Sequence, residues 1–185
     1  MILLLIITVL WVGSEIFLAR FRRADETRQT DDKSSLRLIW GTILISTVAG
    51  PMLRNAGHLI TTRYNALIYF TGIFLICIGL ILRWTAILTL KSSFTVNVAV
   101  SKNQAIIQSG VYKYIRHPAY AGALLSFFGL GFLFNSYLTL AVVFIPIFTA
   151  FVYRMGVEER LLAEAFKDQY EGYMDHTWRL IPGIY

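Results

Sequence analysis

Five apolar runs constrain the fold of this chain more than any other feature. They cover residues 1–19, 38–53, 64–82, 119–134 and 137–152, and the third can continue as helix toward Leu90. Each run is close to the length that crosses about 30 Å of hydrocarbon. The last two are slightly short for an untilted span, which local thinning of the bilayer or burial against other helices would accommodate. Because lipid offers the backbone no hydrogen bonds, the runs must be helices. We therefore predict an all-α integral membrane protein with about five transmembrane helices.

The ends of these runs give further detail. The first run lacks a basic start and a small-residue cleavage site, so we expect a retained helix and not a cleaved signal peptide. Only Asn135 and Ser136 separate the last two runs, which predicts a tight antiparallel helical hairpin. Glu15 is the single acidic residue inside a span, near one end of it. A transporter would more often place charges near the middle of its helices.

The distribution of basic residues predicts the orientation. With five spans, the first loop, the third loop and the C-terminal tail lie on one side and hold fifteen Lys and Arg residues, whereas the other side holds two. The positive-inside rule assigns the basic side to the cytoplasm. We expect one domain over residues 1–185, in which residues 1–90 supply three N-terminal spans and residues 91–185 a catalytic core on the cytoplasmic face. The membrane would be the cell membrane in a prokaryote or the endoplasmic reticulum in a eukaryote.

Composition argues against several other classes. The net charge of +6 sits in short loops between apolar runs, so membrane orientation explains it and nucleic-acid binding is not expected. The single cysteine, Cys77, excludes a disulfide within the chain. The three histidines form no ligand-spaced pair, so we predict no metal site.

Residues 110–122 form a polar cluster against the fourth apolar run, with the sequence GVYKYIRHPAYAG. Pro118 suits the first position of a helix, and the residue before a proline avoids helical geometry, so His117 should lie at the junction of loop and helix. Arg116 and His117 would then flank a helix N-terminus, which favours an anionic group. The preceding loop, from about residue 91, lacks helical periodicity and is expected to be irregular or extended over residues 94–100.

The C-terminal tail is the second polar region. The pattern over residues 151–173 predicts a helix that leaves the membrane, with Arg154 and Glu158 four residues apart on one face. Tyr170 and Tyr173 follow three residues apart, and Trp178 and Arg179 suit the membrane interface.

Together these two regions resemble a known family. The pattern Gly-x-Tyr-x-x-x-Arg-His-Pro-x-Tyr-x-Gly, the Arg and Glu-Glu of the exiting helix, Tyr-x-x-Tyr and a late Arg and Pro are similar to the isoprenylcysteine carboxyl methyltransferases and related membrane phospholipid methyltransferases. The resemblance covers about residues 94–182. It implies S-adenosylmethionine as the cofactor and methylation of a lipid-linked acceptor, with the bilayer and a prenylated cysteine as partners.

The resemblance also implies roles for single residues. It makes Arg154 and Glu158 the catalytic pair, with Arg154 on the substrate, and no metal takes part. It places cofactor contacts on Gln104, Ala105, Ile106, Ile107, Tyr112, His117, Pro118, Ala119, Tyr120 and Glu158. In chemical terms Glu158 suits the cofactor amine or ribose hydroxyls, Arg116 with His117 suits its carboxylate, and tyrosine faces attract a sulfonium.

Other interpretations stay open for these residues. Arg116 and Lys113 can be interfacial anchors, the tyrosines an aromatic belt, and Arg154 with Glu158 an ordinary helical pair. Gly122, Ser126 and Gly129 are better explained by close helix packing than by ligand contact. The favoured activity is methylation of the prenylcysteine carboxylate. The alternatives are N-methylation of a phospholipid or other small lipid on the same scaffold, and a membrane protein without enzymatic activity.

Overall fold

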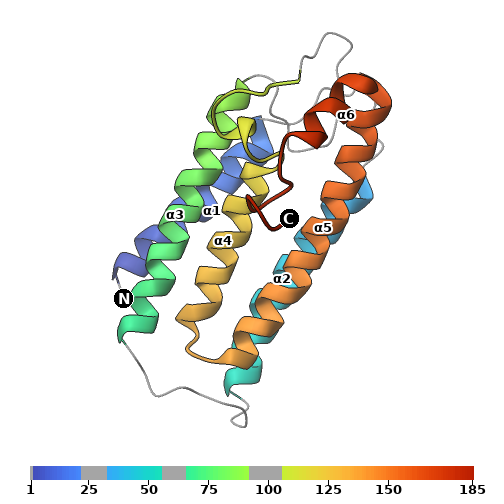
Figure 1. The fold of residues 1–185 in the computed structure, drawn as a ribbon. Helices are drawn as coiled ribbons and strands as arrows, with labels where there is room; N and C mark the ends of the chain where they lie inside the picture. The colour runs from blue at the N-terminus through green and yellow to red at the C-terminus, as the bar shows by residue number, and fades with distance from the viewer. Residues whose placement is uncertain (1, 22–32, 56–65, 92–105) are drawn as a thin grey trace.

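The computed structural model describes residues 2–21, 33–55, 66–91 and 106–185, and within these ranges the fold is helical (Figure 1). The elements are α1 (Ile2–Phe21), α2 (Lys33–Asn55), α3 (Ala66–Leu90), a single 3₁₀ turn η2 (Gly110–Lys113), α4 (Pro118–Leu133), α5 (Tyr137–Phe166) and α6 (Asp168–Asp175). The all-α prediction is confirmed for this part of the chain. Residues 94–100 and most of the predicted irregular loop lie outside the described residues.

The helices follow the apolar runs closely. Helix α3 continues to Leu90, as the sequence suggested, and α2 begins at Lys33, ahead of its apolar run. Among the described residues three helices are long and apolar enough to cross a membrane, at Ser34–Leu53, Ala66–Leu90 and Tyr137–Phe166. The apolar stretch Val9–Leu18 of α1 and the whole of α4 are shorter. The number of spans therefore stays a prediction, whereas the helices and their apolar character are observed.

Helices α3 and α4 pack against each other with their backbones almost in contact. A Cβ atom added at Gly122 would lie 2.5 Å from the Gly79 carbonyl oxygen, and one at Gly129 would lie 2.6 Å from the Gly72 carbonyl oxygen. Ser126 is fully buried in the same seam and donates to the Gly122 carbonyl at 3.0 Å. These small residues pack the helices, as expected, because only small side chains let two backbones approach so closely.

A second pair is formed by α2 and α5, and the α4–α5 hairpin joins the two pairs. The Thr139 hydroxyl of α5 donates to the Gly50 carbonyl of α2 at 3.2 Å. At the turn, Asn135 adopts a positive φ of 52°, and the Ser136 hydroxyl accepts from the Thr139 amide at 3.3 Å. The predicted tight hairpin is therefore confirmed. Helix α1 packs on α3 through Ile7, beside Ile73 and Ile76.

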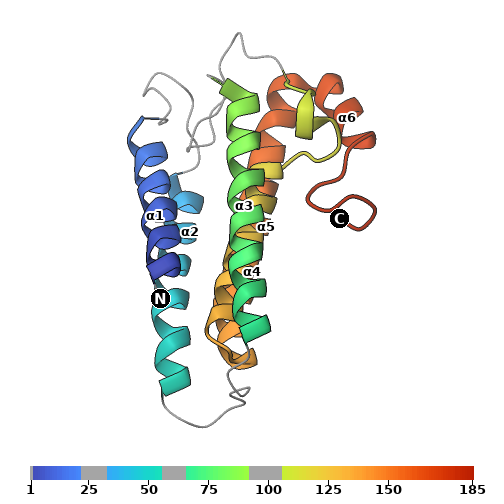
Figure 2. The ribbon, with the colours of Figure 1, turned by 90° about the vertical axis from the view of Figure 1, so that its left-hand side faces the viewer.

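The polar regions gather at one end of the bundle, opposite the α4–α5 turn (Figures 1 and 2). Lys167 breaks the long tail helix with a φ of 47°, and α6 then turns back over this end. The chain after α6 pairs with the segment before α4: the amides of Arg116 and His117 donate to the carbonyls of Trp178 and Arg179 at 2.8 and 3.2 Å. The first residues of α4, the end of α5 and the tail are thereby brought into one site.

Candidate active site

The junction between η2 and α4 has the geometry that the sequence predicted. Pro118 is the first residue of α4, and His117 caps the helix with φ −122° and ψ 55°. Its carbonyl accepts from the amides of Tyr120 and Ala121, which starts the helix. The His117 side chain is buried, and its ring stacks on the ring of Tyr120 with centroids 5.5 Å apart. The loop-to-helix turn thus fixes an imidazole and a phenol side by side.

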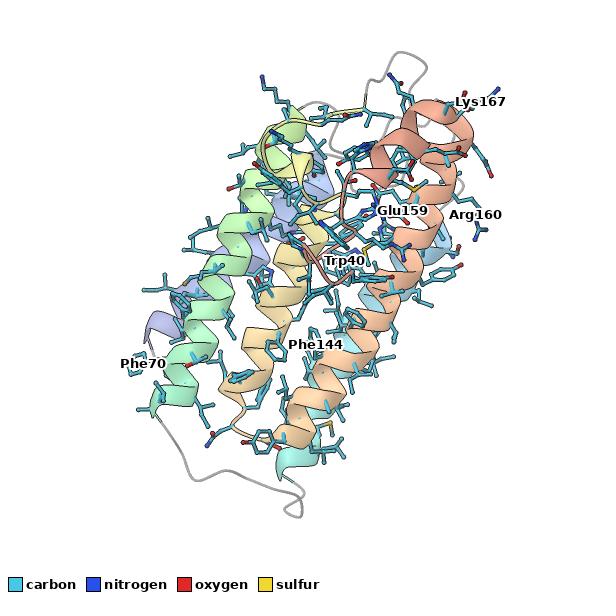
Figure 3. All side chains as sticks on the ribbon, viewed as in Figure 1. Trp40, Phe70, Phe144, Glu159, Arg160 and Lys167 are labelled. Carbon is cyan, nitrogen blue, oxygen red and sulfur yellow. The ribbon has the colours of Figure 1, made fainter. Side chains whose placement is uncertain are left out.

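Glu159 of α5 is the charged centre of this junction. Its Oε1 lies 3.0 Å from His117 Nε2 and 3.1 Å from Arg116 Nε, and its Oε2 lies 2.8 Å from Arg179 Nη2. Figure 3 shows Glu159 directed toward the interior of this end and its neighbour Arg160 directed away from it. One carboxylate therefore ties α5 to the start of α4 and to the C-terminal tail.

Arg116 meets an anionic group, as its position suggested, and that group is the chain's own Glu159. The sequence offered it, with His117, to an anionic group at the helix N-terminus. In the structure its Nη1 donates to the carbonyl oxygens of Met174, at 3.0 Å, and Thr177, while its Nε pairs with Glu159. These hydrogen bonds hold the C-terminal tail against the segment that precedes α4.

Arg154 is buried one turn and a half earlier on α5. Its Nε donates to the hydroxyl of Tyr120 at 3.0 Å, and its Nη1 donates to the hydroxyl of Ser35 at 3.0 Å. Tyr120 also packs edge-on against Phe151. A guanidinium at this depth needs a functional or structural reason, since burying a charge is costly. The interpretation of Arg154 and Glu158 as an ordinary exposed pair is thus excluded for Arg154.

Glu158 lies beside the same histidine and has an atom without a hydrogen bond. Its Oε2 is 3.8 Å from His117 Nδ1, outside hydrogen-bond distance, and is buried with no hydrogen-bond partner among the described residues. The side chain as a whole keeps 28% of its surface exposed. Buried acceptors are nearly always satisfied, so an unsatisfied carboxylate oxygen fits a bound donor group.

Two tyrosines complete this side of the site. Tyr112 of η2 is buried, and its carbonyl accepts from the Tyr173 hydroxyl of α6 at 2.7 Å. Burial, and then the charge of Glu158, raise the pKa of the Tyr112 phenol well above its ordinary range. Burial raises the pKa of Tyr173 to about 12, against the opposing charge of Arg116. Both phenols therefore stay protonated and can donate at any physiological pH.

A pocket in the helix bundle reaches the same region from the apolar side. It has a volume of about 90 Å³. Its lining comes from five helices: Trp11, Glu15, Leu36, Ile39, Trp40, Ile43, Arg83, Tyr120, Ala123, Phe127, Phe151 and Arg154. Figure 3 shows Trp40 in the view between α4 and α5. Helices α1 and α2 thus line the pocket together with α3, α4 and α5, so residues on both sides of position 90 contribute to it.

The pocket wall contains an ion pair that the sequence did not predict. Arg83 Nε lies 2.7 Å from Glu15 Oε1, and Arg83 Nη2 donates to Glu15 Oε2 at 2.8 Å. Arg83 Nη1 also donates to the Ala119 carbonyl at 3.2 Å, in the first turn of α4. The signal was present in the sequence, since two opposite charges interrupt two apolar runs, and charges inside a bilayer seek each other.

The comparison with family models gives one decisive match. Residues 71–164 match the model of the isoprenylcysteine carboxyl methyltransferase (ICMT) family. The chain belongs to this family. The match includes most of α3, which the resemblance seen in the sequence did not reach, and it ends at Glu164.

Curated relatives and a solved structure agree with ICMT membership. The protein-S-isoprenylcysteine O-methyltransferase of Schizosaccharomyces pombe is 30% identical over 59% of this chain and 47% of its own length. Enzyme B of that name from Arabidopsis thaliana is 31% identical over 61% of this chain and 58% of its own length. The solved structure of a eukaryotic intramembrane Ras methyltransferase, ICMT, matches with a TM-score of 0.60 and 28% identity over 81% of this chain and 51% of that one. The chain thus spans about half the length of these relatives.

The predicted ICMT-like site residues can now be located. His117, Pro118, Ala119 and Tyr120 form the first turn of α4 and its cap, with Tyr112 close before them. Ile106 and Ile107 are half-buried in a segment without regular structure, whereas Gln104 and Ala105 lie outside the described residues. Glu158 lies beside His117, and both Glu158 and Arg154 interact with Tyr120.

Proposed function

We propose that this ICMT-family chain is an integral membrane methyltransferase that uses S-adenosylmethionine to esterify the carboxylate of a prenylated cysteine. The observation that carries the proposal is the position of Tyr120. On one side its ring stacks on His117, beside the unsatisfied Glu158 oxygen. On the other side its hydroxyl binds Arg154 in the wall of an apolar pocket. Tyr120 therefore lies where a polar site and a mostly apolar pocket meet.

The polar side fits the cofactor. S-adenosylmethionine supplies an electrophilic methyl group on a sulfonium when it is bound. Glu158 would accept hydrogen bonds from its amine or ribose, which supports the unsatisfied oxygen as a contact. Tyr112, His117 and Tyr120 would face the rest of it, together with Ile106 and Ile107. Aromatic faces attract a cation, so the tyrosines suit a sulfonium.

The apolar side fits an anionic lipid acceptor. Arg154 would hold the acceptor carboxylate, which is ionised near neutral pH. In that position the carboxylate could take the methyl group, and the electron pair of the carbon–sulfur bond would stay on sulfur. The negative and positive charges cancel and no proton moves, so the reaction needs positioning and exclusion of water more than acid or base. The prenyl chain would occupy the pocket, and the active face would be cytoplasmic.

Transfer of labelled methyl from S-adenosylmethionine to N-acetyl farnesylcysteine by the purified chain in liposomes tests the proposal. The expected product is a base-labile methyl ester. Phosphatidylethanolamine is the matched acceptor control. Label on this lipid would show that the acceptor is an amine and not a carboxylate. Cofactor binding without transfer to either would refute the acceptor, and lack of cofactor binding would refute the enzyme.

A further inference from the structure

The two ends of the pocket between the helices differ in polarity. Three helices contribute both a charged or hydroxyl-bearing residue and an apolar one to the lining. On each of them the polar residue lies nearer to the end where α6 and η2 are found. The pairs are Glu15 with Trp11, Tyr120 with Phe127, and Arg154 with Phe151. The polar groups thus gather at one end of the pocket, next to the first turn of α4. A lipid acceptor placed in it would point its head toward Tyr120 and its chain away.

The other end of the pocket is lined by an aromatic pair. The rings of Trp11 from α1 and Phe127 from α4 have centroids 5.0 Å apart and are tilted by 54°. Phe127 is buried, and Ile43 of α2 lines the same end. Tyr120 and Phe127 are seven positions apart on α4, which at 1.5 Å per residue gives a depth of about 10 Å.

The pocket is too narrow for a long chain while these side chains keep their places. Its volume of about 90 Å³ is below the ~150 Å³ of an engineered cavity that holds one benzene ring. A prenyl chain must therefore displace side chains as it enters. Ala123, the residue between Tyr120 and Phe127 on the same face of α4, offers little to displace, whereas Trp11 and Phe127 are the bulky groups in line with the chain.

We infer that Trp11 and Phe127 form the stop of the lipid pocket and set the longest acceptor chain that this enzyme methylates. This inference rests on the proposed function, because it takes the acceptor's lipid chain as the occupant. It assigns α1, which the family match does not include, a part in substrate selection. Arg154 then binds the carboxylate of the acceptor, and the aromatic pair limits the length of its prenyl chain.

Chain-length selection by variants tests the inference. The measurement is kcat/KM for N-acetylcysteine acceptors that carry geranyl, farnesyl or geranylgeranyl chains, in one lipid composition. Removing a ring should raise the ratio for geranylgeranyl over farnesyl by about tenfold in Phe127→Ala and in Trp11→Ala, since one methylene in an apolar pocket already changes selectivity by that order. Ala123→Leu, which fills the pocket above the stop, should shift the preference toward geranyl.

The matched control is Phe128→Ala. Phe128 is the next residue of α4, and its ring packs on Phe132 and Phe144, away from the pocket lining. Loss of packing alone would alter both phenylalanine variants alike, whereas a stop predicts a changed ratio only in Phe127→Ala. Phe127→Leu gives a milder change where the alanine variant does not fold.

The outcomes distinguish failure of the chain-length stop from failure of the proposed function. If the wild-type chain methylates the acceptors but the ratio in Phe127→Ala and Trp11→Ala follows that in Phe128→Ala, the stop is refuted and the proposed function stands. If the wild-type chain binds the cofactor yet methylates none of the three acceptors, the proposed function fails and the inference falls with it.

Discussion

Glu15 and Arg83, sixty-eight residues apart, meet through both carboxylate oxygens, at 2.7 and 2.8 Å. Their side chains keep only 19% and 12% of their surface exposed. Arg83 also holds the Ala119 carbonyl, so the pair links α1 to α3 and to the first turn of α4.

Breaking this pair should destabilise the protein. We expect Glu15→Gln or Arg83→Gln to lower the free energy of unfolding by about 3 kcal/mol, because each leaves an uncompensated, largely buried charge. The charge-swapped double variant, Glu15→Arg with Arg83→Glu, should recover part of the loss. Thermal unfolding in one detergent measures both, with the exposed Arg160→Gln as control. Additive losses in the double variant would show that the two residues are not coupled.

Arg154 should affect turnover and leave cofactor affinity nearly intact. Removing a charged hydrogen bond to the acceptor costs about 1.5–3 kcal/mol, so Arg154→Ala should lower kcat/KM by on the order of a hundredfold. Arg154→Lys should recover little, since an ammonium cannot reproduce the planar fork that reaches Tyr120 and Ser35. Titration calorimetry with S-adenosylmethionine serves as the readout of folding and binding. Equal loss of both functions would contradict the assignment.

Glu158 and Glu159 should separate cofactor binding from attachment of the tail. Glu158→Gln should weaken cofactor affinity by about tenfold, because it removes a charge from an otherwise unsatisfied acceptor. Glu159→Gln should instead loosen residues 176–185, since Glu159 pairs with Arg116, His117 and Arg179. Limited proteolysis and calorimetry on both isosteric variants distinguish the two effects. Early tail cleavage in Glu158→Gln and not in Glu159→Gln would reverse the roles.

The sequence predicted the helices well because hydropathy and helix-end signals are local. The Pro118 start of α4, the Asn135-Ser136 turn and the packing role of Gly122 all follow from short-range sterics. The partners of Arg116 within the chain were not predicted, for a complementary reason. Its partners, Glu159 and the carbonyls of Met174 and Thr177, come from residues more than forty positions away, and the tail that carries them folds back through backbone bonds that no periodicity indicates.

The pocket could not be predicted from the sequence, because it too depends on contacts between residues that are far apart in the chain. Its lining combines residues from five helices, and the apolar ones among them look like ordinary parts of apolar runs. Trp11 and Phe127 become neighbours only when α1 packs beside α4. By contrast, Arg154, His117 and Tyr120 were found because they belong to polar clusters with recognisable spacing. Sequence patterns therefore pointed to the polar residues of the candidate site, whereas its apolar pocket is seen only in the fold.

The seam between α3 and α4 gives a prediction that is independent of activity. A Cβ atom at Gly122 would lie 2.5 Å from the Gly79 carbonyl oxygen and 2.6 Å from the Arg83 amide nitrogen, and neither backbone atom can move without separating the helices. Gly122→Ala should therefore lower the free energy of unfolding by about 2 kcal/mol. It should also displace Arg83 from Ala119 and so weaken cofactor binding. Gly13→Ala, where the added atom meets nothing within 4 Å, is the matched control and should leave both properties unchanged. Equal melting temperatures for the two variants would mean that α3 and α4 are not in backbone contact.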